Sequence, residues 1–260
     1  MIKLKTGNKT ISTERQAFIM GILNVTPDSF YEQSRGSYEK AMKLIEDGAD
    51  ILDIGGESTR PGFEDVPEDE EIERVIPLIE KIRKVSDIPV SLDTRKAKVL
   101  QAAVKEGIDI YNDVSAFDYN PESLQIASKN SLSVIIMNNQ GKDIKSTNAF
   151  FDRKVKLALK NGVSSNRIIL DPGIGFNKTP EENICLIRNA EKLGKGKYPV
   201  LMALSRKSCI GHITGRTVNE RLAGTLTANI ISVIKGCQIL RVHDVKETLD
   251  ALNVIKTVLS

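Results

Sequence analysis

Eight short apolar runs separated by amphipathic segments constrain the fold of this chain more than any other feature. Each run has the length of a β-strand, and its nearly continuous apolar character is typical of parallel strands covered on both faces. The runs are residues 17–25, 50–56, 89–93, 109–115, 132–138, 167–173, 199–205 and 238–244. The segments between them have the apolar spacing of helices, and glycines that typically follow a helix end close several of them (Gly48, Gly107, Gly162 and Gly236).

Eight strand-then-helix units within 260 residues favour a (β/α)8 TIM barrel. A doubly wound open sheet with helices on both faces stays open as an alternative at this point. Because barrels of this size commonly form one domain, we expect residues 1–260 to form a single domain.

Composition argues against several classes of partner. The formal net charge is only +3, the basic residues are scattered, and there is no Trp to stack on bases, so we expect no nucleic-acid partner. The polar amino terminus and the lack of an apolar run near 18 residues indicate neither a leader peptide nor a membrane span. The three cysteines are far apart and lack CxxC spacing, so we expect reduced thiols in a cytoplasmic protein, without a disulfide or zinc site.

Polar residues follow every one of the eight runs. They are Asn24, Glu57 to Arg60, Asp93, Asn112 with Asp113, Asn138, Asp171, Ser205 to Lys207, and Arg241 with His243. A single Asn or Asp after a strand is most often a helix cap. In a barrel, however, the carboxyl ends of all strands meet at one face, which is where active sites lie. The repeated pattern therefore predicts a site at that face.

These residues combine two kinds of chemistry. Arg60, Lys207, Arg241 and His243 are donors suited to an anion, and Asn24, Thr26 and Thr59 suit a phosphate or a magnesium ion. Asp93, Asn112 and Asp171 can instead read the amidine-like edge of a nitrogen heterocycle. We therefore expect a ligand that joins an anion to a heterocycle.

Two further motifs restrict the chemistry. The stretch DPGIGF at 171–176 forces a turn through which backbone can approach a ligand, and SRKS at 205–208 places Lys207 at a helix start. The sequence has no Ser-His-Asp set, histidine cluster, GxGxxG or P-loop, which argues against hydrolytic triads and nicotinamide chemistry.

Seven ordered motifs resemble one family across residues 20 to 245. They are GILNVTPDSF, DIGGESTRPG, SLDTRK, YNDVS, DPGIGFNKT, SRKSCIG and RVHDV. In this order they resemble dihydropteroate synthase, the folate-pathway enzyme that sulfonamides inhibit. The resemblance implies a barrel, usually dimeric, that joins 6-hydroxymethyl-7,8-dihydropterin pyrophosphate to p-aminobenzoate and releases pyrophosphate with Mg²⁺.

The resemblance also implies roles for individual residues. The pterin would be held by Asp93, Asn112, Met137, Asp171 and Lys207. The pyrophosphate would be bound by Asn24, Thr59, Arg241 and His243, with Asn24 also the metal ligand. The p-aminobenzoate would be bordered by Arg60, Pro61, Phe176 and Ser208. Of these, Asn24, Asp93, Asp171 and Lys207 would be the catalytic residues.

Several positions depart from the family pattern. Glu32 replaces a loop aspartate, Asn138 and Asn139 end the fifth run where His-Met is usual, and Asn177 and Ala203 stand where glycine is usual. These changes make a non-catalytic pterin-binding paralogue an alternative. A second alternative is a methyltransferase on a similar barrel that acts between a reduced folate and a corrinoid protein, although the ESTRPG and SRK segments argue against it.

Overall fold

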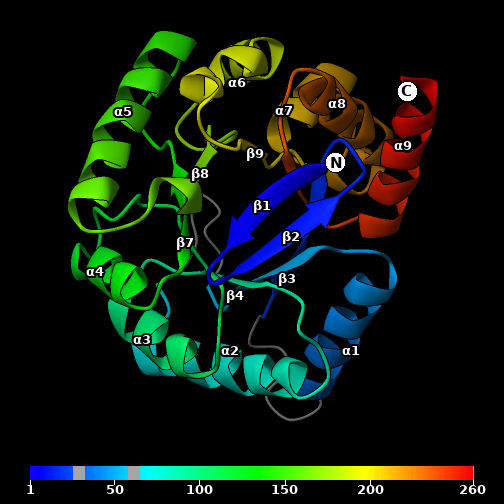
Figure 1. Ribbon diagram of the computed structural model, residues 1–260. Helices are drawn as coiled ribbons and strands as arrows, with labels where there is room; N and C mark the ends of the chain where they lie inside the picture. Colours follow the sequence, from blue (N-terminus) through cyan, green and yellow to red (C-terminus); the bar gives the residue numbers. More distant parts are fainter. Residues whose placement is uncertain (26–32, 58–64, 260) are drawn as a thin grey trace.

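The computed structural model describes residues 1–25, 33–57 and 65–259, and its centre is an eight-stranded parallel sheet (Figure 1). The strands are β3 (Phe18–Asn24), β4 (Ile51–Gly55), β5 (Val90–Asp93), β6 (Ile110–Asp113), β7 (Ser133–Met137), β8 (Ile168–Asp171), β9 (Leu201–Met202) and β10 (Ile239–Val242). Their order in the sheet is β8-β7-β6-β5-β4-β3-β10-β9. An isolated parallel bridge between Leu170 and Val200 joins the two outermost strands, which makes the sheet a nearly closed barrel.

Helices surround this barrel (Figure 1). They are α1 (Gln33–Glu46), α2 (Glu68–Arg83), α3 (Ala97–Lys105), α4 (Glu122–Lys129), α5 (Ile144–Lys160), α6 (Pro180–Arg188), α7 (Ser208–Thr214), α8 (Leu222–Ile234) and α9 (Val245–Val258). Short 3-10 turns lie at η2 (Ser165–Arg167), η3 (Ala190–Gly196) and η4 (Val218–Glu220). The predicted TIM barrel is therefore confirmed, whereas a single domain over residues 1–260 stays a prediction. No helix in the described parts of the chain is both long and apolar enough to cross a membrane.

Two layers of buried side chains support the barrel. One lies between strands and helices, where residues such as Leu52 and Leu92 are fully buried. The other fills the barrel interior, where Phe18, Met20 and Ile239 pack together. The continuous apolar runs follow from this arrangement, because side chains on both faces of each strand are covered.

An N-terminal hairpin was not predicted from the sequence. Strands β1 (Ile2–Thr6) and β2 (Lys9–Thr13) pair antiparallel around a turn in which Gly7 has φ +56°. Leu4 packs into the barrel-interior cluster, and the Ser133 hydroxyl on β7 donates to the Lys5 carbonyl at 2.8 Å. The hairpin therefore covers the amino end of the barrel and leaves the carboxyl ends of the strands as the open face (Figure 1).

Candidate active site

A cavity of about 730 Å³ lies at the carboxyl ends of the strands. Of the predicted site residues, it is lined by Asn24, Phe176, Lys207, Ser208, Arg241 and His243. Ala203, the departure at the predicted pterin position, also lines it. Thr26, Thr59, Arg60, Pro61 and Glu32 lie outside the described residues. The structure thus brings residues of β3 and β10, of the segments that follow β8 and β9, and of the start of α7 to one cavity.

Arg241 on β10 joins the cavity to a buried acidic cluster. Its Nε donates to Asp53 at 2.6 Å, and its Nη2 donates to Asp93 at 2.7 Å. Asn112 donates to the Asp53 carboxylate at 3.3 Å. Asp53 therefore contacts one residue from the predicted pterin set and one from the predicted pyrophosphate set.

Asp53 was missed by reasoning from the sequence. It lies inside the run DILDIGG, not at its end, so the search for polar residues after strands passed over it. Its side chain is fully buried on β4. A carboxylate in the middle of an otherwise apolar strand was the available signal, because buried charges are kept only where they are paired.

The Asp93 carboxylate has one oxygen that is left without a hydrogen-bond partner among the described residues. This oxygen, Oδ1, is buried. Burial raises the pKa of Asp93 to about 7, and the Arg241 guanidinium opposes this while Asp53 adds to it. Burial acts to lower the pKa of Arg241, but Asp53 and Asp93 outweigh it and the pKa rises. Arg241 is therefore charged, and Asp93 carries beside it a buried acceptor that is unpaired in the described part of the chain.

Asp171 and Met137 lie next to each other at the ends of β8 and β7. Asp171 accepts a hydrogen bond from the Gly173 amide at 2.7 Å. Burial raises the pKa of Asp171, and the charge of Lys207 lowers it. Met137 is buried and adds an apolar surface at the same level.

Lys207 precedes α7 and points across to the turn after β8. Its Nζ donates to the Ile174 carbonyl and lies 4.6 Å from the centroid of the Phe176 ring. Burial lowers the pKa of Lys207 to about 8, while Asp171 raises it. Ser208 begins α7 with an exposed side chain. Phe176, Lys207 and Ser208 therefore form one wall of the cavity.

His243 and Asn24 lie on another side of the cavity. The His243 Nδ1 lies 2.9 Å from the Ser205 hydroxyl, which also accepts from the His243 amide at 3.2 Å. Asn24 ends β3 with an exposed side chain. Together with Arg241, these residues give this side of the cavity a cationic and amide character.

Asn138 does not face the cavity. Its side-chain amide donates to the Gly141 carbonyl at 2.7 Å and to the Thr147 hydroxyl at 3.0 Å, and its oxygen accepts from the Gly141 amide at 2.7 Å. Asn138 is fully buried, so these bonds satisfy a side chain that water cannot reach. This departure from the family pattern therefore belongs to the loop behind the site.

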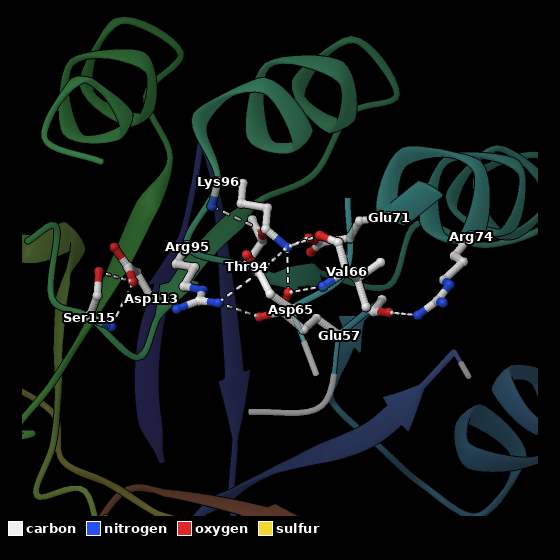
Figure 2. A network of polar contacts seen from close by, with 11 residues as sticks. Glu57, Asp65, Val66, Glu71, Arg74, Thr94, Arg95, Lys96, Asp113 and Ser115 are labelled. Atoms are coloured by element: carbon white, nitrogen blue, oxygen red, sulfur yellow. Dashed lines mark hydrogen bonds and ion pairs between the residues drawn. The ribbon is translucent and has the colours of Figure 1, made fainter. Parts of the chain in front are cut away.

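Glu57, one of the polar residues after the second run, does not line the cavity and lies instead in a polar network with Lys96 and Glu71 (Figure 2). It pairs with Lys96, which further donates to Glu71 on α2 at 2.9 Å and to the Val66 carbonyl at 2.6 Å. The Val66 amide donates back to Glu57 at 3.1 Å. This cluster ties residues on either side of 58–64 to the turn after β5.

Comparisons with known proteins agree with this geometry. A family model described as pterin binding enzyme matches residues 20–243. The chain is 41% identical over 256 residues to a dihydropteroate synthase from Clostridium beijerinckii, covering 94% of this chain and 95% of that protein. It also resembles Xanthomonas albilineans dihydropteroate synthase solved with 4-aminobenzoic acid, with a TM-score of 0.93, 37% identity, and coverage of 99% of this chain and 98% of that chain.

The same Xanthomonas albilineans enzyme has been solved in complex with 7,8-dihydropteroate. That structure matches with a TM-score of 0.90 and 35% identity over 100% of this chain and 99% of that chain. A family model that covers most of the chain, together with relatives similar over nearly their full length, shows the family. The chain belongs to the pterin-binding enzyme family.

Proposed function

We propose that the chain is a dihydropteroate synthase, which joins 6-hydroxymethyl-7,8-dihydropterin pyrophosphate to p-aminobenzoate and releases pyrophosphate. The observation that carries the proposal is the buried Oδ1 of Asp93, with which no described residue pairs; the carboxylate is bound by Arg241, a residue that lines the cavity of about 730 Å³. The similarity to proteins named dihydropteroate synthase, one of them solved with 7,8-dihydropteroate, supports it.

The pterin is proposed to bind beside Arg241, on a floor formed by the carboxyl ends of β5, β6 and β8, where Asp93, Asn112 and Asp171 are buried. Their acceptor oxygens suit the N–H groups on the edge of a pterin, and the Asn112 amide supplies a donor as well. Lys207 adds a cation at the rim of this floor and Met137 an apolar surface. A flat heterocycle bound here is removed from water, so each hydrogen bond discriminates strongly.

The pyrophosphate is proposed to bind toward Asn24, Arg241 and His243, with Thr59 as a further contact. Among the described residues, no group of three His, Cys, Asp or Glu side chains could hold a metal ion. Magnesium commonly uses one or two protein oxygens together with substrate phosphates, and the exposed Asn24 amide fits that pattern. When bound, Mg²⁺ would neutralise charge on the leaving pyrophosphate.

The p-aminobenzoate is proposed to bind against Phe176 and Ser208, beside Lys207, with Arg60 and Pro61 completing its border. The bond between the pterin methylene carbon and pyrophosphate breaks, and the bond from the aniline nitrogen to that carbon forms. Arg241 and His243 stabilise charge on the departing pyrophosphate, and Asp93 with Asp171 offset positive charge on the pterin. The weakly basic aniline attacks as the neutral amine and loses its proton afterwards, so no strong general base is needed.

The alternatives have less support. The methyltransferase has no need for a cavity wall that gathers Arg241, His243 and Lys207. The non-catalytic paralogue drew its support from departures such as Asn138, and that side chain is taken up by the loop behind the site. Ala203 stays the departure most able to affect pterin binding, because it is buried and lines the cavity.

A homodimer in the cytoplasm is proposed as the working form. An apolar groove of about 470 Å³ lies between α6, α7 and α8 and includes Ile187, Ile210 and Ile231. Nearby Ile213 and Ile234 are 58% and 62% exposed. A second copy of the chain would cover this surface. Sedimentation velocity tests whether the protein is a dimer in solution.

Product identification tests the proposed function. Purified protein incubated with Mg²⁺, dihydropterin pyrophosphate and p-aminobenzoate should form 7,8-dihydropteroate, identified by mass spectrometry after chromatography. A protein that binds the pterin tightly but forms no dihydropteroate would instead be the paralogue. A protein that transfers a methyl group from methyltetrahydrofolate would be the methyltransferase.

A further inference from the structure

The ammonium group of Lys178 lies among three backbone carbonyls. Its Nζ donates to Asn138 at 2.9 Å, to Gly173 at 3.0 Å and to Phe176 at 3.1 Å. A lysine ammonium has three protons, so these contacts use its full donor capacity. Through them, Lys178 joins the end of β7 to the turn that follows β8.

Helix electrostatics do not explain this position. Lys178 directly precedes Thr179, the N-cap of α6, whose positive dipole end disfavours a neighbouring cation. Burial lowers the pKa of Lys178 to about 8, which also works against the charged form. The negative charges of Asp171 and Glu182 act to raise the pKa of Lys178, and the three carbonyl contacts fix where its ammonium lies.

The turn held by Lys178 is tightly folded. Gly173 has φ +66°, and a Cβ added there would lie only 2.1 Å from the Asn138 carbonyl oxygen. Because of this close approach, the carbonyls of Asn138 and Gly173 both reach the Lys178 ammonium. Lys178 neutralises the repulsion between these oxygens, because each of them points at the same ammonium.

The same turn forms the wall on which Lys207 rests. The Ile174 carbonyl accepts from Lys207, and the Phe176 ring lies under its ammonium. A Cβ at Gly175 would lie 3.1 Å from the Lys207 Cδ. A shift of the turn therefore moves both the Phe176 ring and the surface that Lys207 contacts.

We propose that Lys178 is a positioning residue that fixes Phe176 and the turn 173–176 for binding of the aromatic amine substrate. The inference rests on the proposed function for the identity of that substrate, p-aminobenzoate. In the part of the chain that the structure describes, the hydrogen bonds of Lys178 all go to backbone carbonyls, so it acts through the turn that carries Phe176.

The test replaces Lys178 with Met, which keeps the length of the chain and removes all three donors. The KM for p-aminobenzoate should rise about 10-fold or more, equivalent to the loss of about 1.4 kcal/mol. The KM for dihydropterin pyrophosphate should rise clearly less, because Asp93 and Asn112 lie on other strands and only Asp171 of the pterin set feels the charge of Lys178. Lys178→Arg, which retains donors and charge, should recover part of the p-aminobenzoate binding.

Lys142→Met is the matched control. The Lys142 side chain is 59% exposed, and its Nζ lies 3.6 Å from the carboxylate of Glu182 at the start of α6, the helix that Lys178 precedes. Both KM values should stay at the wild-type level in this variant. If Lys178→Met does not fold, Lys178→Gln, which keeps two amide protons, is assayed instead. Its KM values for p-aminobenzoate and for dihydropterin pyrophosphate are compared in the same way.

Two results would overturn the proposal: unchanged KM values in a folded Lys178 variant, or equal rises in both KM values, which indicate general loss of structure. Hydrogen exchange separates this inference from the proposed function. The amides of residues 173–176 should exchange faster in Lys178→Met than in Lys142→Met, whether or not the protein forms dihydropteroate. Equal exchange in the two variants would refute the positioning role even if the wild-type protein is not a synthase.

Discussion

Replacing Asp53 with Asn should move the pH dependence of the enzyme to lower pH. Asp53 and Asp93 share the guanidinium of Arg241, with N to O distances of 2.6 and 2.7 Å. The negative charge of Asp53 helps burial to raise the pKa of Asp93 to about 7. Asn keeps an acceptor oxygen for Arg241 but removes this negative charge. The pKa of Asp93 should therefore be lower in the variant, so that Asp93 ionises at a lower pH.

The size of the change follows from the charges involved. Repulsion of about 1–2 kcal/mol between two carboxylates on one guanidinium corresponds to roughly 1 in pKa. Ionised Asp93 is the form that accepts N–H groups from the pterin, so wild-type activity should fall as the pH drops through about 7. In Asp53→Asn this midpoint should lie near pH 6, on the order of one unit lower. Activity on the plateau should fall about 10-fold, because the charge-assisted bond to Arg241 becomes a neutral one.

The assay is kcat/KM for dihydropterin pyrophosphate from about pH 5 to about pH 9, which reports ionisations of the free enzyme and free substrate. The same substrate is used with both proteins, so its own ionisations contribute equally and the difference belongs to the enzyme. An unchanged midpoint, or one at higher pH in Asp53→Asn, would contradict the coupling between Asp53 and Asp93.

Three further predictions concern Lys207, the turn after β8, and Lys96. Lys207→Ala should lower turnover about 100-fold or more with the circular dichroism spectrum unchanged, and near-wild-type turnover would show that the site is wrongly assigned. Gly173→Ala should lower the free energy of unfolding in urea by about 2–5 kcal/mol, because the new side chain is strained in a left-handed conformation and also overlaps a neighbouring carbonyl. Gly175→Ala should show mainly the left-handed strain, about 1–2 kcal/mol. Equal losses in the two variants would refute the close approach at Gly173. Lys96→Met should lower the free energy of unfolding by about 3–5 kcal/mol, because buried Glu71 loses its ion pair and buried Glu57 keeps only the one with Arg95. Lys98→Met, which breaks an exposed pair, should leave the urea midpoint unchanged, and equal midpoints for Lys96→Met and wild type would contradict the assigned burial.

The barrel was predictable because its strands are covered on both faces, so they appear as apolar runs with a polar residue at each end. The hairpin β1–β2 was not, because β2 is largely exposed and has only one apolar residue, Ile11. Strand β9 covers only Leu201–Met202 within the predicted 199–205. Its neighbour Pro199 has no N–H for the ladder and contributes only its carbonyl, to Leu170 at 3.0 Å.

The site was predictable where a residue type at a strand end carries the chemistry, as at Lys207 and Arg241. Asp53 and Lys178 act through a contact across the barrel or onto backbone carbonyls, and sequence spacing does not reveal such contacts. Asn138 was misread for the same reason: its place after a strand indicated the cavity, but its hydrogen bonds lead to the loop behind.

Release of pyrophosphate, measured while single components are omitted, is the decisive assay for a synthase. Release is expected only when dihydropterin pyrophosphate, p-aminobenzoate and Mg²⁺ are all present, with one pyrophosphate formed for each dihydropteroate. Tight pterin binding without release would contradict the assignment as a synthase and leave a pterin-binding protein in which Ala203 is the first residue to change to Gly.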